Sequence, residues 1–156
     1  MLSHQNLSKM TKTKERDFDK WRADTLGYVY FSRLNNLIIK ETGDDSPFFD
    51  YLIDIGDNDN RQTGRLFGIS IKAFQNGNLN KKIPVSPYKN ISFPVLNVFF
   101  DTHKDVGFYN WIQKPSEKGD LKLEKSEQAI EELNTESLKS IVQKISYWYD
   151  NKNGKN

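Results

Sequence analysis

The sequence predicts an α/β or α+β domain in which helices flank a central mixed β-sheet of at least four strands. Segments with helical spacing of apolar residues lie near the two ends of the chain, at 16–40 and 126–149. Between them lie four short apolar runs, each bounded by Gly, Pro, Asn or Asp, as strands commonly are. This helix–strands–helix order favours a sheet that is covered by the terminal helices.

The first helical segment extends over residues 16–40. Its apolar side chains at helical spacing are Phe18, Trp21, Leu26, Val29, Tyr30, Leu34, Leu37 and Ile38. Gly27 either separates two helices or marks a close packing contact. Gly43 supplies the stop signal that follows.

The apolar runs at 51–55 and 66–72 predict two strands joined by a polar turn. Charged residues lie inside both runs, namely Asp54 in the first and Lys72 at the end of the second. Side chains alternate between the faces of a strand, so Ser70 and Lys72 share one face. In a hairpin, Asp54 and Lys72 can occupy the same face of neighbouring strands. Placing both charges there costs stability, and a chemical role would account for their presence.

Two further strands and a second helix are expected downstream. The nearly continuous apolar run at 93–101 is typical of a central strand covered on both faces. A shorter strand follows at 106–112. The stripe of apolar residues over 126–149 predicts a helix. Asn134 is a candidate N-cap within it, for a helix that begins at Thr135.

The chain is expected to form one domain. Its 156 residues are enough for a sizeable core. The polar segment 1–14 is predicted to be a flexible lead-in, 15–150 the single domain, and 151–156 a frayed tail.

Composition excludes several classes of site. With 23 basic and 21 acidic residues, the net charge of +2 argues against nucleic-acid binding by overall charge alone. The absence of cysteine excludes disulfides and thiolate sites, and two histidines argue against a zinc site. Without a membrane-length apolar stretch or a signal peptide, no membrane contact and a cytoplasmic location are expected. The three tryptophans are expected in the core: Trp21, Trp111 and Trp148.

Residues 50–54 (DYLID) and 63–72 (TGRLFGISIK) together resemble the core of restriction-endonuclease-like nucleases, whose signature is written PD-(D/E)XK. The likeness is to the Mrr-like branch and to small nuclease-like domains of prokaryotic antiviral systems. In that branch the motif runs D-Y-G-I-D, then T-G, then V-Q-x-K. Residues 93–96 and 109–112 also resemble the branch, so the likeness covers roughly residues 15–145.

The resemblance implies a site for Mg²⁺ or Mn²⁺ that hydrolyses phosphodiesters. Asp54 would bind the metal, and the backbone carbonyl of Ile71 would be a second ligand. Lys72 would orient the attacking water or stabilise developing charge. A carboxylate from the first helical region, Asp24 or Glu41, would complete the metal site.

The chain departs from the family pattern at two positions. Ser70 occupies the position of the family's Glu, Asp or Gln, and can reach a metal only through water. Leu52 replaces the usual Gly. In the loop that follows, the basic residues Lys81, Lys82 and Lys89 are candidate phosphate contacts, with an ordinary solvated loop as the alternative.

Structural roles are the alternatives for the acidic residues. Asp54 and Lys72 would then form a half-buried ion pair of small energetic value. For Asp50, capping of a turn is favoured over metal binding. Asp57 and Asp59 lack the glycine and closing glutamate of a calcium loop.

Two functions follow. The first is a magnesium-dependent endonuclease domain, with DNA favoured over RNA, in a prokaryotic defence or restriction-type system. Such a domain would act as a homodimer or as a subunit of a larger complex. The alternative is a catalytically inactive adaptor or regulatory subunit that keeps the nuclease fold.

Overall fold

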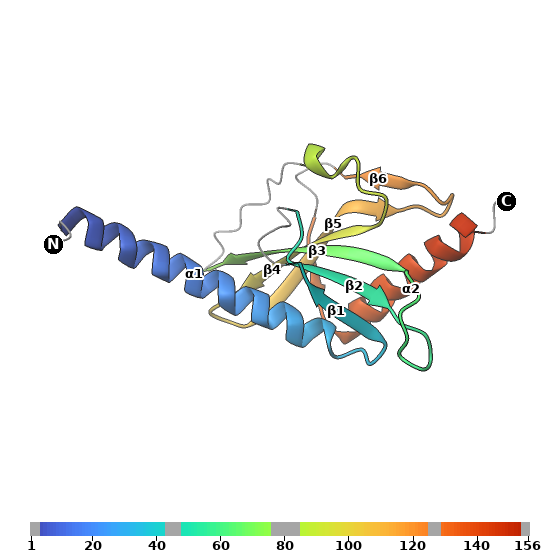
Figure 1. Cartoon of the computed structure of the whole chain (residues 1–156), viewed down its shortest axis with the longest axis horizontal. Helices are drawn as coiled ribbons and strands as arrows, with labels where there is room; N and C mark the ends of the chain where they lie inside the picture. Colours follow the sequence, from blue (N-terminus) through green and yellow to red (C-terminus); the bar gives the residue numbers. More distant parts are fainter. Residues whose placement is uncertain (1–3, 43–47, 76–84, 125–128, 154–156) are drawn as a thin grey trace.

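A computed structural model describes residues 4–42, 48–75, 85–124 and 129–153, which contain two α-helices and a mixed sheet (Figure 1). The elements are α1 (His4–Phe31), β1 (Leu37–Glu41), β2 (Tyr51–Ile55), β3 (Leu66–Phe74), a short 3-10 turn η1 (Ser86–Tyr88), β4 (Val95–Asp101), β5 (Val106–Pro115), β6 (Leu121–Leu123), β7 (Glu131–Leu133) and α2 (Thr135–Asn153).

The strands form one sheet in the order β1-β2-β3-β4-β5-β6, and β7 also pairs with β5. The pairing of β3 with β4 is parallel, and all the other pairings are antiparallel. β6 and β7 pair with different parts of β5, at 113–115 and 107–109 respectively. The predicted α+β class, with a central mixed sheet flanked by helices, is therefore confirmed.

Both helices contribute to the core on one face of the sheet. Phe67, Ile69 and Ile71 of β3 belong to the same buried cluster as residues from α1 and α2. α1 approaches closely at Gly27, where a Cβ atom would lie 2.5 Å from Cδ1 of Ile71. Gly27 thus marks a packing contact inside one continuous helix, one of the two roles considered for it.

The opposite face is covered by η1 and by loop segments. Tyr88 of η1 packs there with Val95, Phe99 and Ile112. Residues 48–49 and 91–93 add aromatic and aliphatic side chains around them. Every residue of β4 is buried, which confirms that 95–101 is a central strand covered on both faces.

The first helix and its continuation differ from the prediction. α1 begins at His4, so residues 4–14, expected as a lead-in, form its first turns, and this end of the helix extends past the sheet (Figure 1). The predicted helix over 16–40 is wrong in its last part, because Leu37–Glu41 is a strand. That strand pairs antiparallel with β2 over five residues, which decides its conformation.

The second helix begins where the predicted N-cap lies. The N–H of Ser137 donates to Oδ1 of Asn134, and the N–H of Asn134 donates to Oγ of Ser137, both at 2.9 Å. The helical prediction is wrong for 131–133, which form β7 on the edge of β5. α2 continues to Asn153, and 154–156 lie outside the described residues.

The expectation that all three tryptophans lie in the core is correct for Trp148, which is buried in α2, and wrong for Trp21. Trp21 is 59% exposed on α1, where its ring contacts that of Phe18. Trp111 is half-buried. Among the described residues, no helix is long and apolar enough to cross a membrane.

Candidate functional site

The predicted pairing of Asp54 with Lys72 is wrong. Asp54 lies opposite Leu66 in the β2–β3 register. Lys72 is six residues further along β3, about 20 Å away at the usual rise per residue. The register of the hairpin therefore places the two charges at opposite ends of it.

Asp54 instead holds the turn between β2 and β3. It is 2% exposed, and its two carboxylate oxygens accept the N–H groups of Thr63 and Gly64, each at 3.0 Å. Gly64 adopts a positive φ of 80°, which glycine does without steric cost, and this conformation is part of the turn whose N–H groups Asp54 binds. These bonds satisfy the buried carboxylate without a cation, so Asp54 has a structural role.

A different set of oxygens converges at the other end of the hairpin. Nζ of Lys20 donates to Oδ1 of Asp24 at 2.9 Å, to Oδ1 of Asp50 at 2.7 Å and to the backbone carbonyl of Ile71 at 2.8 Å. The second oxygen of Asp50 accepts the N–H of Ile71 at 2.6 Å. We call Lys20, Asp24, Asp50 and the Ile71 carbonyl the lysine-centred cluster. It brings together two predicted metal ligands, Asp24 and Ile71.

Three elements position this cluster. Lys20 and Asp24 are four residues apart on α1 and so lie on one face of the helix. Asp50 immediately precedes β2, and its own N–H donates to the Ile69 carbonyl of β3. Arg22 attaches α1 to the β4–β5 turn through a two-pronged ion pair with Asp105.

Negative charge exceeds positive charge around the cluster. Burial raises the pKa of Asp24 above its ordinary value, Lys20 opposes this rise, and the charges of Asp50 and Glu41 add to it. Burial raises the pKa of Tyr51 to about 12, and the nearby carboxylates contribute. The group of carboxylates thus favours a cation at its centre.

An open cavity of about 520 Å³ adjoins the cluster at the end of β3. Lys20, Ile71 and Lys72 line it together with Asp19 of α1 and Gln75. Lys72 is exposed and forms no salt bridge with any described residue. The cavity therefore places a solvent-accessible ammonium group beside the lysine-centred cluster.

Ser70 lies on the opposite face of β3 from the helices and is buried. It lies near Tyr88, whose hydroxyl donates to the Phe48 carbonyl at 3.0 Å; burial raises the pKa of Tyr88, and Ser70 opposes part of this rise. In the parallel register Ser70 faces Asn97, which donates to Asn110 on β5. Ser70 is thus part of a row of buried polar residues across three strands.

The remaining predicted site residues are dispersed. Glu41 is exposed at the end of β1, and it influences the cluster through its charge on Asp24. Lys89 is exposed at the end of η1. Lys81 and Lys82 lie outside the described residues.

Lys20 and Asp50 are the residues that sequence reasoning missed or assigned elsewhere. Asp50 was expected to cap a turn, but its carboxylate joins α1 to β3. The available signal was the charged pair Lys20 and Asp24 at helical spacing, followed by an acidic residue just before a strand. Nothing in that spacing shows that the helix crosses the hairpin at this point.

The donor set fits a hard divalent cation. It consists of oxygens only, from two carboxylates and one carbonyl, and the Lys20 ammonium group already occupies a position shared by all three. Among the described residues, no group of three or more His, Cys, Asp or Glu side chains surrounds one point. Any metal bound here would therefore keep part of its shell as water or substrate.

Comparison with known proteins identifies no relative. No protein-family model, no curated protein and no solved structure matches this chain.

Proposed function

We propose that the chain is a metal-dependent nuclease domain whose active site is the lysine-centred cluster. The observation that carries the proposal is the convergence of the Asp24, Asp50 and Ile71 oxygens on one cation beside an open cavity. The resemblance of 50–54 and 63–72 to PD-(D/E)XK nucleases supports the same reading, with Asp50 in the metal-binding role first given to Asp54.

Asp24, Asp50 and the Ile71 carbonyl would hold Mg²⁺ or Mn²⁺. A cation bound there supplies Lewis acidity toward a phosphate oxygen and toward water. Lys72 faces the cavity and would contact the phosphate, where its positive charge stabilises the charge that develops during hydrolysis. Lys20 would have to leave its three oxygen partners, and its ammonium group would then also be available to an anionic substrate.

The biological setting is proposed from the resemblance alone. It is a prokaryotic defence or restriction-type system in which the domain cleaves nucleic acid, DNA rather than RNA, as a homodimer or within a larger complex. Exposed apolar residues on α1, including Phe18 and Trp21, supply surface for such an assembly. Light scattering over a concentration series should detect a species larger than one chain, and a strict monomer would contradict the homodimer.

Cleavage assays test the activity directly. Purified protein should cleave single- or double-stranded DNA in the presence of Mg²⁺ or Mn²⁺, and EDTA should abolish this cleavage. Asp50→Asn should lower the rate by about 10²–10³, the usual loss on removing one preorganised electrostatic group. Glu117→Gln, at an exposed loop carboxylate outside the cluster, should leave the rate unchanged.

The second candidate is a catalytically inactive adaptor. It is favoured by the three hydrogen bonds that Lys20 already makes and by the buried Ser70 at the position of the family's acidic residue. For an adaptor, the cluster only joins α1 to the sheet. Asp50→Asn would then lower the midpoint of urea unfolding, and neither DNA nor RNA would be cleaved by the native chain with any divalent metal.

A further inference from the structure

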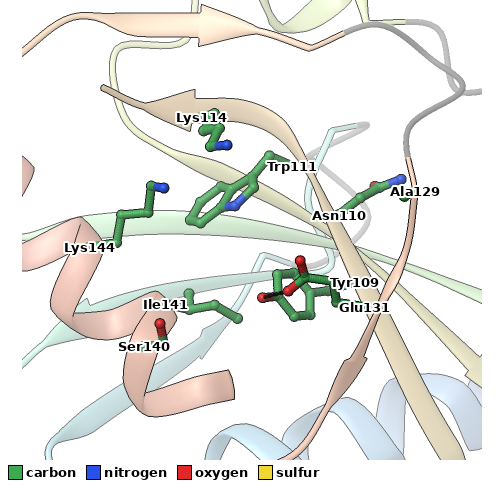
Figure 2. Close-up of a pocket in the computed structure, with 9 residues that line it drawn as sticks. All are labelled: Tyr109, Asn110, Trp111, Lys114, Ala129, Glu131, Ser140, Ile141 and Lys144. Atoms are coloured by element: carbon green, nitrogen blue, oxygen red, sulfur yellow. Dashed lines mark hydrogen bonds between the residues drawn. The ribbon is translucent and has the colours of Figure 1, made fainter. Parts of the chain in front are cut away.

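A second cavity lies away from the lysine-centred cluster, between β5, β7 and α2 (Figure 2). Its volume is about 250 Å³. Tyr109, Trp111 and Lys114 reach it from β5, Glu131 from β7, and Ser140 and Lys144 from α2. None of these residues belongs to the lysine-centred cluster.

The position of the cavity follows from the edge of β5. Residues 107–109 pair with β7 and 113–115 pair with β6, so the two short strands leave the middle of β5 between them. Trp111 is in this middle part and is half-buried. α2 then closes the cavity from the helix-covered face of the sheet (Figure 2).

Two lysines supply positive charge to the cavity. Lys114 comes from β5 and Lys144 from α2, and both approach the indole of Trp111 (Figure 2). Neither forms a salt bridge within the part of the chain that the structure describes. Two ammonium groups that line one cavity and form no salt bridge with its Glu131 carboxylate favour an anion between them.

The aromatic and acidic groups add a second kind of recognition. The face of a tryptophan ring is a platform on which nucleic-acid bases stack. Glu131 accepts the Tyr109 hydroxyl at 2.7 Å through Oε2, and burial together with this bond raises the pKa of Tyr109. Oε1 of Glu131 accepts no hydrogen bond from the described residues, so it is available to an exocyclic amino group. Because the Glu131 carboxylate would repel a phosphate, the phosphate is assigned to the part of the cavity that Lys114 and Lys144 line.

We propose that this cavity binds a nucleotide, with its base against Trp111 and its phosphate between Lys114 and Lys144. The volume of about 250 Å³ lies just below the roughly 300–1,000 Å³ of sites that enclose drug-sized ligands, so the cavity would hold the base and the phosphate of a nucleotide without enclosing the whole molecule. The nucleotide is either a free mononucleotide or one unit of a single strand. The inference does not depend on nuclease activity, since it uses no residue of the lysine-centred cluster.

Calorimetric titration in EDTA tests the proposal without any cleavage. AMP should bind at least about tenfold more tightly than either adenosine or inorganic phosphate, because each of these lacks one of the two contacts. Lys114→Gln and Lys144→Gln should each weaken AMP binding by about fivefold to tenfold. Lys139→Gln, at an exposed position on the same helix, is the matched control and should change binding less than about twofold.

A short single-stranded oligonucleotide identifies the source of the nucleotide. If a strand is the ligand, an eight-residue oligo(dA) binds more tightly than AMP, and Lys144→Gln weakens both. If a free nucleotide is the ligand, AMP binds and the oligonucleotide does not. Binding of neither at millimolar concentration, equal affinity for AMP and phosphate, or AMP binding that survives the Lys114→Gln/Lys144→Gln double change would overturn the proposal.

Failure of this inference is distinguishable from failure of the proposed nuclease function. Asp50→Asn should leave AMP binding intact, because Asp50 lies in the other site. Trp111→Phe keeps an aromatic ring in place and should weaken AMP while leaving phosphate binding unchanged. A loss of both, accompanied by a lower unfolding midpoint, would instead assign Trp111 a packing role and would count against base stacking.

Discussion

Replacement of Lys20 by methionine tests the lysine-centred cluster most directly. Methionine keeps an unbranched side chain and removes the ammonium group. Asp24, Asp50 and the Ile71 carbonyl each lose a hydrogen bond of 2.7–2.9 Å. The two carboxylates are then left close together with no described cation between them, so the folded state should lose stability in the absence of divalent metal.

The size of this loss follows from the exposure of the groups. The side chains of Lys20, Asp24 and Asp50 are 43%, 32% and 25% exposed, so water screens them in part. Breaking a fully buried pair costs about 3–5 kcal/mol, and an exposed pair contributes about 0–1 kcal/mol. We expect an intermediate loss of about 1–3 kcal/mol, which lowers Tm by about 2–4 °C per kcal/mol for a chain of this size.

Divalent cations should reverse the loss. In Lys20→Met the three oxygens are available to Mg²⁺ or Mn²⁺, whereas in the native chain the cation must first displace an ammonium group. A ligand at about 100 times its Kd stabilises the folded state by about 2.7 kcal/mol. The variant should therefore gain more stability from Mn²⁺ than the native chain does.

Urea unfolding in EDTA and in Mn²⁺ measures both effects. Lys139→Met, at an exposed position of α2, controls for the substitution itself. The double change Lys20→Met/Asp50→Asn should lose the metal-dependent gain. A Lys20→Met variant that is as stable as the native chain in EDTA, or equal stabilisation of both proteins by Mn²⁺, would contradict the role of Lys20 in the cluster.

Three further changes test other parts of the structure. Asp54→Asn should cost about 1–3 kcal/mol in urea unfolding, because the amide cannot accept both turn N–H groups, and it should leave metal binding intact. Gly68→Ala should lower the free energy of unfolding by about 1–3 kcal/mol, because a Cβ at Gly68 would lie 2.5 Å from the Phe49 ring. Phe49→Leu should restore part of this loss, and equal stability of Gly68→Ala and the native chain would contradict this packing. Burial raises the pKa of Tyr51 from 10.0 to about 12, so the free energy of unfolding should fall as the pH rises from 10 to 12. In urea unfolding over this pH range, the stability of Tyr51→Phe should fall less steeply than that of the native chain.

Local patterns were sufficient for several elements. The predicted strands at 51–55, 66–72 and 93–101 carry their own apolar runs and turn residues, and they correspond to β2, β3 and β4 with ends that differ by at most two residues. The start of α2 was readable because the Asn134 cap acts within three residues of itself. Leu37–Glu41 was misread because its apolar residues also match helical spacing, and only pairing with β2 decides between the two.

The arrangement of the candidate site could not be predicted from local sequence patterns. By itself, the sequence determined the strands of the hairpin and the acidic and basic residue types near them. The family resemblance predicted two of the converging groups, the Ile71 carbonyl and Asp24, the latter as one of two candidates with Glu41. Tertiary structure alone decided that Asp54 supports a turn, and that Lys20 on α1 meets Asp50 across β3. The reason is physical: hairpin register depends on the length of the turn, and the approach of α1 depends on the small volume of Gly27 against Ile71. Neither is encoded in the spacing of charged residues along the chain.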